Sequence, residues 1–194
     1  PDVPVMTIEL GHFALILAFA IAAISALTGF FFWRGAGRTS VYLQQSAVLQ
    51  FLLVAAAFAV LIQGFVTSDF SLALAANHSN TAAPLIFKIT AVWGNHEGSM
   101  VLWVLILVLM GAAVAAFGRD LPRDLLALVL STQSLLVAAF SGFTLFTSNP
   151  FARLDPPAWE GADLNPVLQD IGLAIHPPLL YAGYVGFSVC FSFA

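Results

Sequence analysis

Long uncharged apolar runs constrain this chain more than any other feature. Four of them hold about 20 residues each, the length that a helix needs to cross the roughly 30 Å hydrocarbon core of a bilayer. They cover residues 13–33, 42–66, 99–117 and 125–147. Only 8% of the residues are charged, against roughly 25% in a soluble domain, so polar surface is too scarce for a water-soluble globule. The sequence predicts an all-α integral membrane protein, a polytopic helical bundle.

A fifth apolar run begins near Leu179 and continues to Ala194, the last residue of the sequence. Its 16 residues would cover roughly 24 Å as a helix, at about 1.5 Å of rise each. That is less than the hydrocarbon core of a bilayer. We therefore expect about five transmembrane helices in residues 1–194. The fifth would cover residues 179–194 and be truncated. We interpret the chain as one membrane domain, the N-terminal part of a larger protein.

The arginines indicate how the helices are oriented in the membrane. Arg34 and Arg38 lie between the first and second runs, and Arg119 and Arg123 lie between the third and fourth. Loops rich in Lys and Arg stay on the cytoplasmic side of a membrane. The N-terminus is therefore expected on the outer side, together with the two remaining connections.

Those two outer connections, residues 67–98 and 148–178, have about 30 residues each, and loops of that length usually carry structure or function. In the second, the segment NPVLQDIGLAIH has the pattern of a short amphipathic helix on the membrane surface, with Asn165 as its N-cap. Pro177 disfavours helical backbone at the residue before it. The short helix should therefore end at His176, ahead of the fifth run.

His176 is the residue best suited to chemistry. A neutral imidazole is a good ligand for haem iron. Pro177 and Pro178 follow it and stiffen the backbone that holds it. We expect the ring to point into a pocket that the outer segments enclose. The alternative is a histidine that only interacts with the dipole at a helix end.

A second candidate site lies at the start of the third run, in VWGNHEGSMVLW. His96 and Glu97 are ionisable side chains beside a membrane span, where such residues are costly and often functional. Trp93 and Trp103 are suited either to anchor the helix at the membrane interface or to line a site for a flat ring. A loop-to-helix junction capped by Ser99 would explain the same residues.

The remaining polar and small residues fit structural roles. Glu9 and His12 are spaced as an i, i+3 pair at the outer end of the first run. We expect four glutamines of the second run to bond neighbouring helices: Gln44, Gln45, Gln50 and Gln63. We expect three small residues of the fifth run to allow close helix packing: Ala182, Gly183 and Gly186.

Several function classes are disfavoured by composition. The formal net charge is −4, and neither a basic stripe nor a glycine-rich phosphate loop is present, so nucleic acid is not an expected partner. Cys190 is the single cysteine. It can form no intrachain disulfide and belongs to no zinc-binding pattern, so no metal other than haem iron is expected.

Three longer motifs carry a resemblance to a known family: VWGNHEGSMVLWVL, LFTSNPFARL and GADLNPVLQDIGLAIHPPLLYAGYVGFSVCFSFA. Over essentially its whole length the chain resembles the N-terminal part of the large haem lyase component of the bacterial (system I) cytochrome c maturation machinery. The resemblance implies a protein that accepts b-type haem from a membrane-anchored haem chaperone at the periplasmic face. It then helps to attach that haem to Cys-x-x-Cys-His motifs of apocytochrome c.

The resemblance also implies particular residues and partners. His176, in the HPPLLY motif, falls on one of the two external histidines that ligate the haem iron, and WGNHEGS would line the haem entry. The other external histidine, a tryptophan-rich segment and two transmembrane histidines of the family have no counterpart here, so these residues alone are not expected to form an active haem lyase. Expected partners are the chaperone, apocytochrome c with its thiol-reducing or presenting subunits, other maturation subunits and membrane lipid. The expected location is the bacterial inner membrane; an organelle of bacterial ancestry is the alternative.

Other membrane functions remain as alternatives. A subunit of a respiratory or quinone-reactive b-type haem complex would usually carry paired histidines within its spans. A transporter would be favoured by broken helices and buried charges near the midplane. A structural scaffold would use His176 only to end a helix.

Overall fold

The computed structural model describes residues 6–33 and 37–194, apart from the side chain of Leu173. Arg34, used above to orient the helices, lies outside the described residues. Five long helices follow one another: α1 (Met6–Phe32), α2 (Gly37–Val66), α5 (His96–Phe117), α6 (Arg123–Thr147) and α7 (Ile171–Phe193). Shorter helices connect them: α3 (Ala73–His78), α4 (Leu85–Ala91), and the 3-10 helices η2 (Gly118–Asp120) and η3 (Pro166–Leu168).

The five long helices are each long and apolar enough to cross a membrane. This confirms the expected all-α membrane bundle. The expected start of the fifth helix near Leu179 is wrong, because α7 begins at Ile171. Its 23 residues reach roughly 35 Å, which is enough for a bilayer core.

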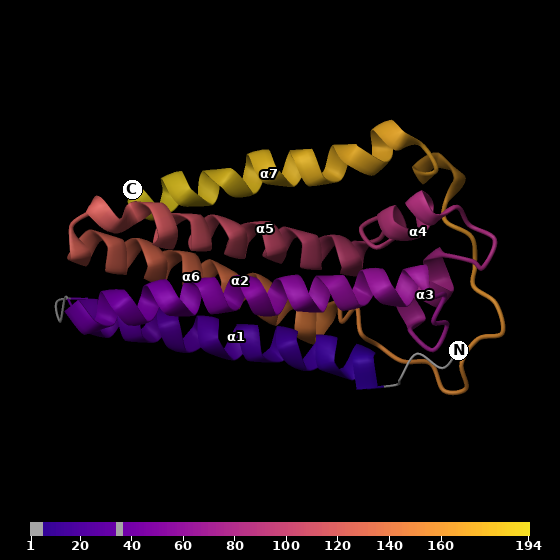
Figure 1. The fold of residues 1–194 in the computed structure, drawn as a ribbon, viewed down its shortest axis with the longest axis horizontal. Helices are drawn as coiled ribbons and strands as arrows, with labels where there is room; N and C mark the ends of the chain where they lie inside the picture. Colours follow the sequence, from indigo (N-terminus) through magenta and orange to yellow (C-terminus); the bar gives the residue numbers. More distant parts are fainter. Residues whose placement is uncertain (1–5, 34–36) are drawn as a thin grey trace.

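Four of these helices form the central bundle, in which α1 packs on α2 and α6, and α5 packs on α2 and α6. Helix α7 lies along α5 and α6 on one side of the bundle (Figure 1). It is the least covered of the five: 11% of its most apolar window is buried, against 33–56% for the others.

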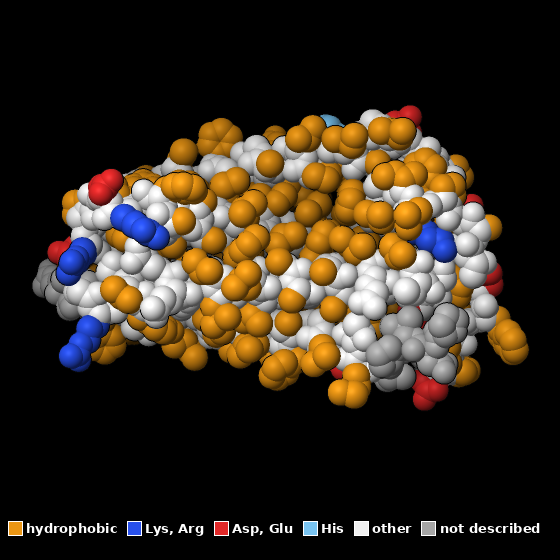
Figure 2. All heavy atoms as spheres, viewed as in Figure 1, with side chains coloured by type: hydrophobic (Ala, Val, Ile, Leu, Met, Phe, Trp, Pro, Cys, Tyr) orange, Lys and Arg blue, Asp and Glu red, His pale blue; other side chains and the backbone are white. Residues whose placement is uncertain are grey.

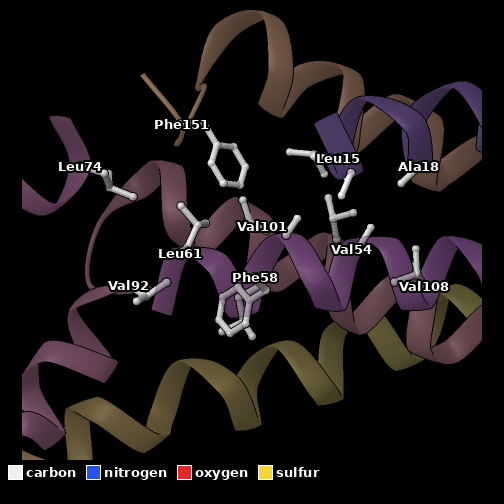
Figure 3. Close-up of a cluster of buried hydrophobic side chains, with 14 of the residues drawn as sticks. Leu15, Ala18, Val54, Phe58, Leu61, Leu74, Val92, Val101, Val108 and Phe151 are labelled. Carbon is white, nitrogen blue, oxygen red and sulfur yellow. The ribbon is translucent and has the colours of Figure 1, made fainter. Parts of the chain in front are cut away.

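The buried core of the bundle is aliphatic, with few aromatic rings. Side chains from α1, α2 and α5 point toward one another across it, and Phe151 closes it from the segment after α6 (Figure 3). Its members include Leu15, Ala18, Val54, Phe58, Leu61, Val101 and Val108. Burying one such side chain contributes about 1.5–3 kcal/mol relative to water, but lipid is itself apolar, so close packing and polar bonds matter more between these helices.

Buried polar side chains join the helices. Gln50 donates to the hydroxyl of Ser134 at 3.4 Å, and Gln44 donates to the carbonyl of Ala115 at 3.1 Å, so two of the four predicted glutamines bond neighbouring helices. Gln45 and Gln63 are exposed. The sequence analysis missed Gln133, which is 2% exposed and joins α6 to two serines of α7, Ser188 at 3.2 Å and Ser192 at 2.9 Å.

The small residues of α7 do not have the predicted role within the described chain. A Cβ added at Gly183 or at Gly186 would meet no atom within 4 Å, and Ala182 is exposed. This side of α7 faces away from the bundle, because Ala174, Val185, Ser188 and Ser192 make the contacts with it.

The two ends of the bundle differ in charge. Arg38, Arg119 and Arg123 lie at the end where α2 and α6 begin, and Figure 2 shows Lys and Arg side chains gathered there, with hydrophobic side chains over the middle. At the other end Arg153 pairs with Glu9 at 3.6 Å and with Asp69 at 3.5 Å. Glu9 therefore pairs with Arg153, whereas the sequence predicted His12.

Both outer connections fold together into a cap over that second end (Figure 1). The segment after α6 runs beside α3: the amide of Leu154 donates to the carbonyl of Ser71 at 2.8 Å, and Ala162 donates to Ala76 at 2.7 Å. Between them lies an isolated antiparallel bridge of Leu72 and Arg153. The cap fixes the loop that leads into α5 relative to the start of α7.

Candidate functional site

A cavity of about 350 Å³ lies where the cap meets the bundle. We call it the junction cavity, because it separates the turn before α5 from the first turns of α7. Three parts of the chain line it: the stretch from the end of α4 through the turn to the start of α5, the segment up to and including η3, and one face of α7. The lining residues are Thr90, Trp93, Gly94, Asn95, His96, Ser99, Leu164, Leu168, Ala174, Pro177 and Tyr181.

The turn before α5 is held by Asn95. Its side-chain oxygen accepts from the amide of Gly98 at 2.7 Å, as the N-cap of α5, and its amide donates to the carbonyl of Ala91 at 2.7 Å. Ser99, predicted as the cap, lies inside the helix and bonds the carbonyl of His96. A Cβ added at Gly98 would overlap the carbonyl oxygen of Val92, so the turn requires glycine there.

Trp93 ties this turn to α7. Its indole N–H donates to the carbonyl of Ala174 at 2.9 Å, and its ring stacks on Phe58 with centroids 6.3 Å apart. In a regular helix the carbonyl of Ala174 would accept from the amide of residue 178. Pro178 has no amide hydrogen, so Trp93 supplies the donor that the helix lacks.

The predicted helix end at His176 is wrong. Helix α7 runs without a break through Pro177 and Pro178. Prolines are tolerated in membrane helices where neighbouring groups satisfy the backbone positions that they leave open, and the indole of Trp93 does this for Ala174. Only the short helix η3 precedes α7, and its N-cap is Asn165, whose side chain accepts from Val167.

His176 does not point into the junction cavity, contrary to the expectation. Ala174, Pro177 and Tyr181 line the cavity, whereas His176 is exposed. The first three share a helix face because they are three and four residues apart. His176 therefore lies beside the cavity, on the uncovered side of α7.

The four histidines differ in their contacts. His12 stacks on Phe151 and lies 3.5 Å from the amide of Asn149, and Nδ1 of His78 lies 3.1 Å from the carbonyl of Leu74. His96 lies 3.1 Å from the hydroxyl of Ser148 and packs edge-on against Phe143. No hydrogen bond or ring contact to His176 is found among the described residues, so its ring nitrogens are open to a ligand.

Three other predicted site residues, Pro178, Trp103 and Glu97, lie outside the junction cavity. Trp103 packs on Tyr181 at 5.1 Å and on Phe140 at 5.7 Å between centroids, and lines a separate apolar cavity of about 340 Å³ between α5, α6 and α7. Glu97, in the first turn of α5, lines neither cavity. The structure therefore brings together Trp93, His96 and Pro177 of the predicted set.

The sequence analysis missed Tyr181, which contacts Trp103 and lines the junction cavity. The missed signal is the spacing of Ala174, Pro177 and Tyr181, which fall on one face of a helix only if that helix continues through the prolines. Ending the helix at His176 hid this face.

The cap carries the one clear pKa shift among the described residues. Glu160 accepts from the hydroxyl of Thr81 at 2.6 Å and from the amides of Gly161 and Thr81. These bonds, with the Thr81 hydroxyl the largest cause, hold the pKa of Glu160 below its ordinary value. The Thr81–Glu160 bond joins the two outer connections.

Comparison with known proteins gives a consistent result. The family model described as "Cytochrome C assembly protein" matches residues 93–194. The "Cytochrome c-type biogenesis protein CycK" of Rhizobium meliloti is 60% identical over 190 residues, which is 97% of this chain and 28% of that protein. The "Cytochrome c-type biogenesis protein CcmF" of Escherichia coli is 46% identical over 96% of this chain and 29% of its own length.

A solved structure is also similar. A "Cytochrome c Heme Lyase CcmF" superposes with a TM-score of 0.82 and 25% identity, over 99% of this chain and 30% of that one. The chain thus spans less than a third of the length of the relatives that it matches.

Proposed function

Because this chain belongs to the cytochrome c assembly protein family, we propose that it forms part of a membrane protein that handles haem and helps to attach it to c-type cytochromes. The relatives named for cytochrome c biogenesis and the solved haem lyase support this function. Haem is the substrate in this proposal, b-type until it is attached. This chain supplies one side of the surface that receives it.

His176 is the proposed ligand of the haem iron. The observation that carries this assignment is that His176, alone among the four histidines, has no contact to its ring within the described residues. Pro177 and Pro178 hold the backbone beside it, and the Trp93 bond to Ala174 fixes the turn that carries it. These contacts fix the backbone position of His176, while its ring, without a partner in the described chain, can turn toward an incoming iron.

The junction cavity is the proposed flank of the haem entry. Trp93 and Tyr181 offer aromatic surface, and His96 offers a polar group held by Ser148. Glu97 and Trp103 lie outside the cavity, so we assign Trp103 to the packing of α7 and assign Glu97 to the positive end of the α5 dipole.

The chemical step needs no nucleophile from this chain. A cysteine thiol of the apocytochrome adds across a haem vinyl group, so that a carbon–sulfur bond forms and the thiol proton passes to the other vinyl carbon. The residues described here would ligate the iron, orient the ring and exclude water.

The arginine end is proposed to face the cytoplasm and the cap the periplasm of a bacterial inner membrane. Arg38, Arg119 and Arg123 support this orientation. The proposed partners at the cap are a haem chaperone, apocytochrome c with its thiol-presenting subunits and other maturation subunits.

The test is His176→Ala in the intact protein, with His78→Ala as the matched control, because His78 bonds the carbonyl of Leu74 within the cap. The purified protein is mixed with haem-loaded chaperone, and haem absorption and cytochrome c yield are recorded. We expect His176→Ala to abolish haem retention and maturation while His78→Ala keeps both. Equal haem retention in the two variants would exclude His176 as the ligand.

A further inference from the structure

A second large cavity among the described residues lies at the arginine end, far from the cap. It is a groove of about 750 Å³ between the first half of α2, the end of α5 and the start of α6. We call it the α2–α5 groove. Its lining is Gly37, Ser40, Val41, Gln44, Gln45, Val48, Leu49, Leu52, Ala115, Ala116, Arg119, Leu121, Arg123 and Leu126.

The part of the groove nearest the arginine end of the bundle is cationic. Arg119 and Arg123 line it, and both are exposed. The neighbouring carboxylates, Asp120 and Asp124, do not line the groove. Within residues 6–33 and 37–194, the ion pairs found involve Arg153, so neither groove arginine forms an ion pair with a described carboxylate.

The inner part of the groove is apolar and open. Val41, Val48, Leu49 and Leu52 are 51%, 41%, 44% and 56% exposed. They follow the axis of α2 for about 16 Å, from the arginine end toward the middle of the bundle. This surface matches the length and polarity of the first part of an acyl chain.

A polar group interrupts the apolar part between Val41 and Val48. Gln44 already donates to the carbonyl of Ala115 at 3.1 Å, but Gln45 is exposed and bonds no group in the described chain. It lies roughly 12 Å along α2 from Gly37, below the charged surface. An amide at this depth in lipid needs a hydrogen-bond partner, and lipid ester carbonyls occur there.

We propose that the α2–α5 groove binds an anionic phospholipid. Its phosphate pairs with Arg119 and Arg123, an ester carbonyl accepts from Gln45, and one acyl chain lies along Val48, Leu49 and Leu52. Charge complementarity favours this occupant over a transmembrane helix, because an apolar helix offers nothing to two arginines. Basic pockets between membrane helices are known sites for such headgroups.

The test compares lipids on the intact protein in mild detergent by native mass spectrometry. Phosphatidylglycerol and phosphatidylcholine with identical acyl chains are titrated into wild type and into the double variant Arg119→Gln/Arg123→Gln. We expect wild type to prefer phosphatidylglycerol, and the double variant to bind it roughly thirtyfold more weakly, since each cation contributes roughly fivefold. The control is Arg38→Gln, an exposed arginine of the same end that does not line the groove.

Further variants separate the groove from general surface charge. Arg119→Lys/Arg123→Lys keeps the charges and should restore most of the preference, and Leu49→Trp should block the acyl part and weaken binding of both lipids. Three results would overturn the proposal: equal binding of the two lipids to wild type, an equal loss in Arg38→Gln, or displacement of the bound lipid by inorganic phosphate alone. Co-purification of a protein partner that excludes both lipids from the groove would overturn it as well.

Discussion

Trp93 illustrates how one side chain allows two prolines to remain within a membrane helix. The proline at position 178 cannot donate to the carbonyl of Ala174, and an unpaired carbonyl in a water-poor site costs about 1–3 kcal/mol. The indole N–H, 81 positions earlier in the chain, bonds that carbonyl. A hydrogen bond thus joins the WGNH turn to the first turns of α7, which carry the HPP motif.

Replacing Trp93 by Phe tests this bond, because Phe keeps the ring stacked on Phe58 but removes the donor. We expect the first turns of α7 to exchange their amide hydrogens about fivefold faster, as the loss of about 1 kcal/mol implies. Hydrogen exchange with mass spectrometry on the purified protein measures this. Trp159→Phe is the control, since Trp159 is fully exposed; the same change in both variants would contradict the assignment.

A second residue-scale prediction concerns the Thr81–Glu160 bond. The pKa of Glu160 is held below 4.5 chiefly by the Thr81 hydroxyl. A carboxylate with a lowered folded-state pKa stabilises the fold above its unfolded pKa, and this contribution is lost as the pH falls through the lower folded value. We expect Thr81→Ala to raise the pKa of Glu160 toward 4.5 and Thr81→Ser to leave it low. NMR titration of ¹³C-labelled glutamate between about pH 2 and 6 measures both, and an unchanged pKa in Thr81→Ala would contradict this.

At the scale of elements, the sequence predicted the transmembrane helices well and the start of α7 poorly. Residues 13–33 and 125–147 were expected as spans from hydropathy alone, and the helices found there are Met6–Phe32 and Arg123–Thr147. The predicted spans were shorter because a search for apolar runs leaves out polar residues at the helix ends, such as Glu9 in α1.

The helix through Pro177 and Pro178 could not be predicted from local preference. Local rules stop a helix before proline, and only a distant donor changes that outcome. The wrong expectation for the His176 side chain has the same origin. Its ring was expected to point into a pocket from the end of a short surface helix, whereas His176 lies inside α7, on a face that the cavity does not contact. The contacts of Gln133 were equally hidden, since its partners Ser188 and Ser192 lie more than 50 residues away.

The turn before α5 gives a prediction at this scale. Gly98→Ala places a methyl group on the carbonyl oxygen of Val92, so the turn must move, at a cost of about 1–3 kcal/mol. Gly183→Ala is the matched control in another helix, because the added methyl group meets no atom within 4 Å. We expect a lower free energy of unfolding for the first variant alone, measured by denaturant titration in detergent; equal stability of the two would contradict the tight turn.

The attachment of α7 to α6 is tested by a double-mutant cycle of Gln133→Ala and Ser192→Ala. These side chains are 2.9 Å apart, and polar bonds between membrane helices contribute about 0.5–1.5 kcal/mol. We expect a coupling energy of that size in the free energy of unfolding. The cycle of Gln63→Ala with Ser192→Ala is the control, since Gln63 is exposed. Equal coupling in the two cycles would show that the measured energy is not from this bond.

At the scale of the whole molecule, the two ends of the bundle differ in their cavities and ion pairs. The cap end carries the junction cavity and His176, and pairs its Arg153 with two carboxylates. The opposite end leaves its arginines unpaired within the described chain and carries the α2–α5 groove. The proposed orientation assigns one end to haem and the other to lipid.

Orientation is tested by single cysteines in a Cys190→Ser background. Ala82→Cys lies in the cap and Asp124→Cys at the arginine end, and both positions are exposed. A membrane-impermeant maleimide added to intact spheroplasts should label Ala82→Cys, and should label Asp124→Cys only after the cells are lysed. Labelling in the reverse order would invert the proposed topology.

The bond between Trp93 and Ala174 also sets the order in which parts of the protein can form during synthesis. A ribosome that has completed the WGNH turn must add about 80 more residues, roughly 4–16 s of synthesis, before the acceptor of the indole exists. Until α7 has entered the membrane beside α5, the junction cavity lacks the face that α7 contributes. The turn before α5 also lacks the hydrogen bond from Trp93 to Ala174. The junction cavity therefore forms only after α7, the last of the five described spans, is in place, so under the proposed function a nascent chain does not present this site to haem early.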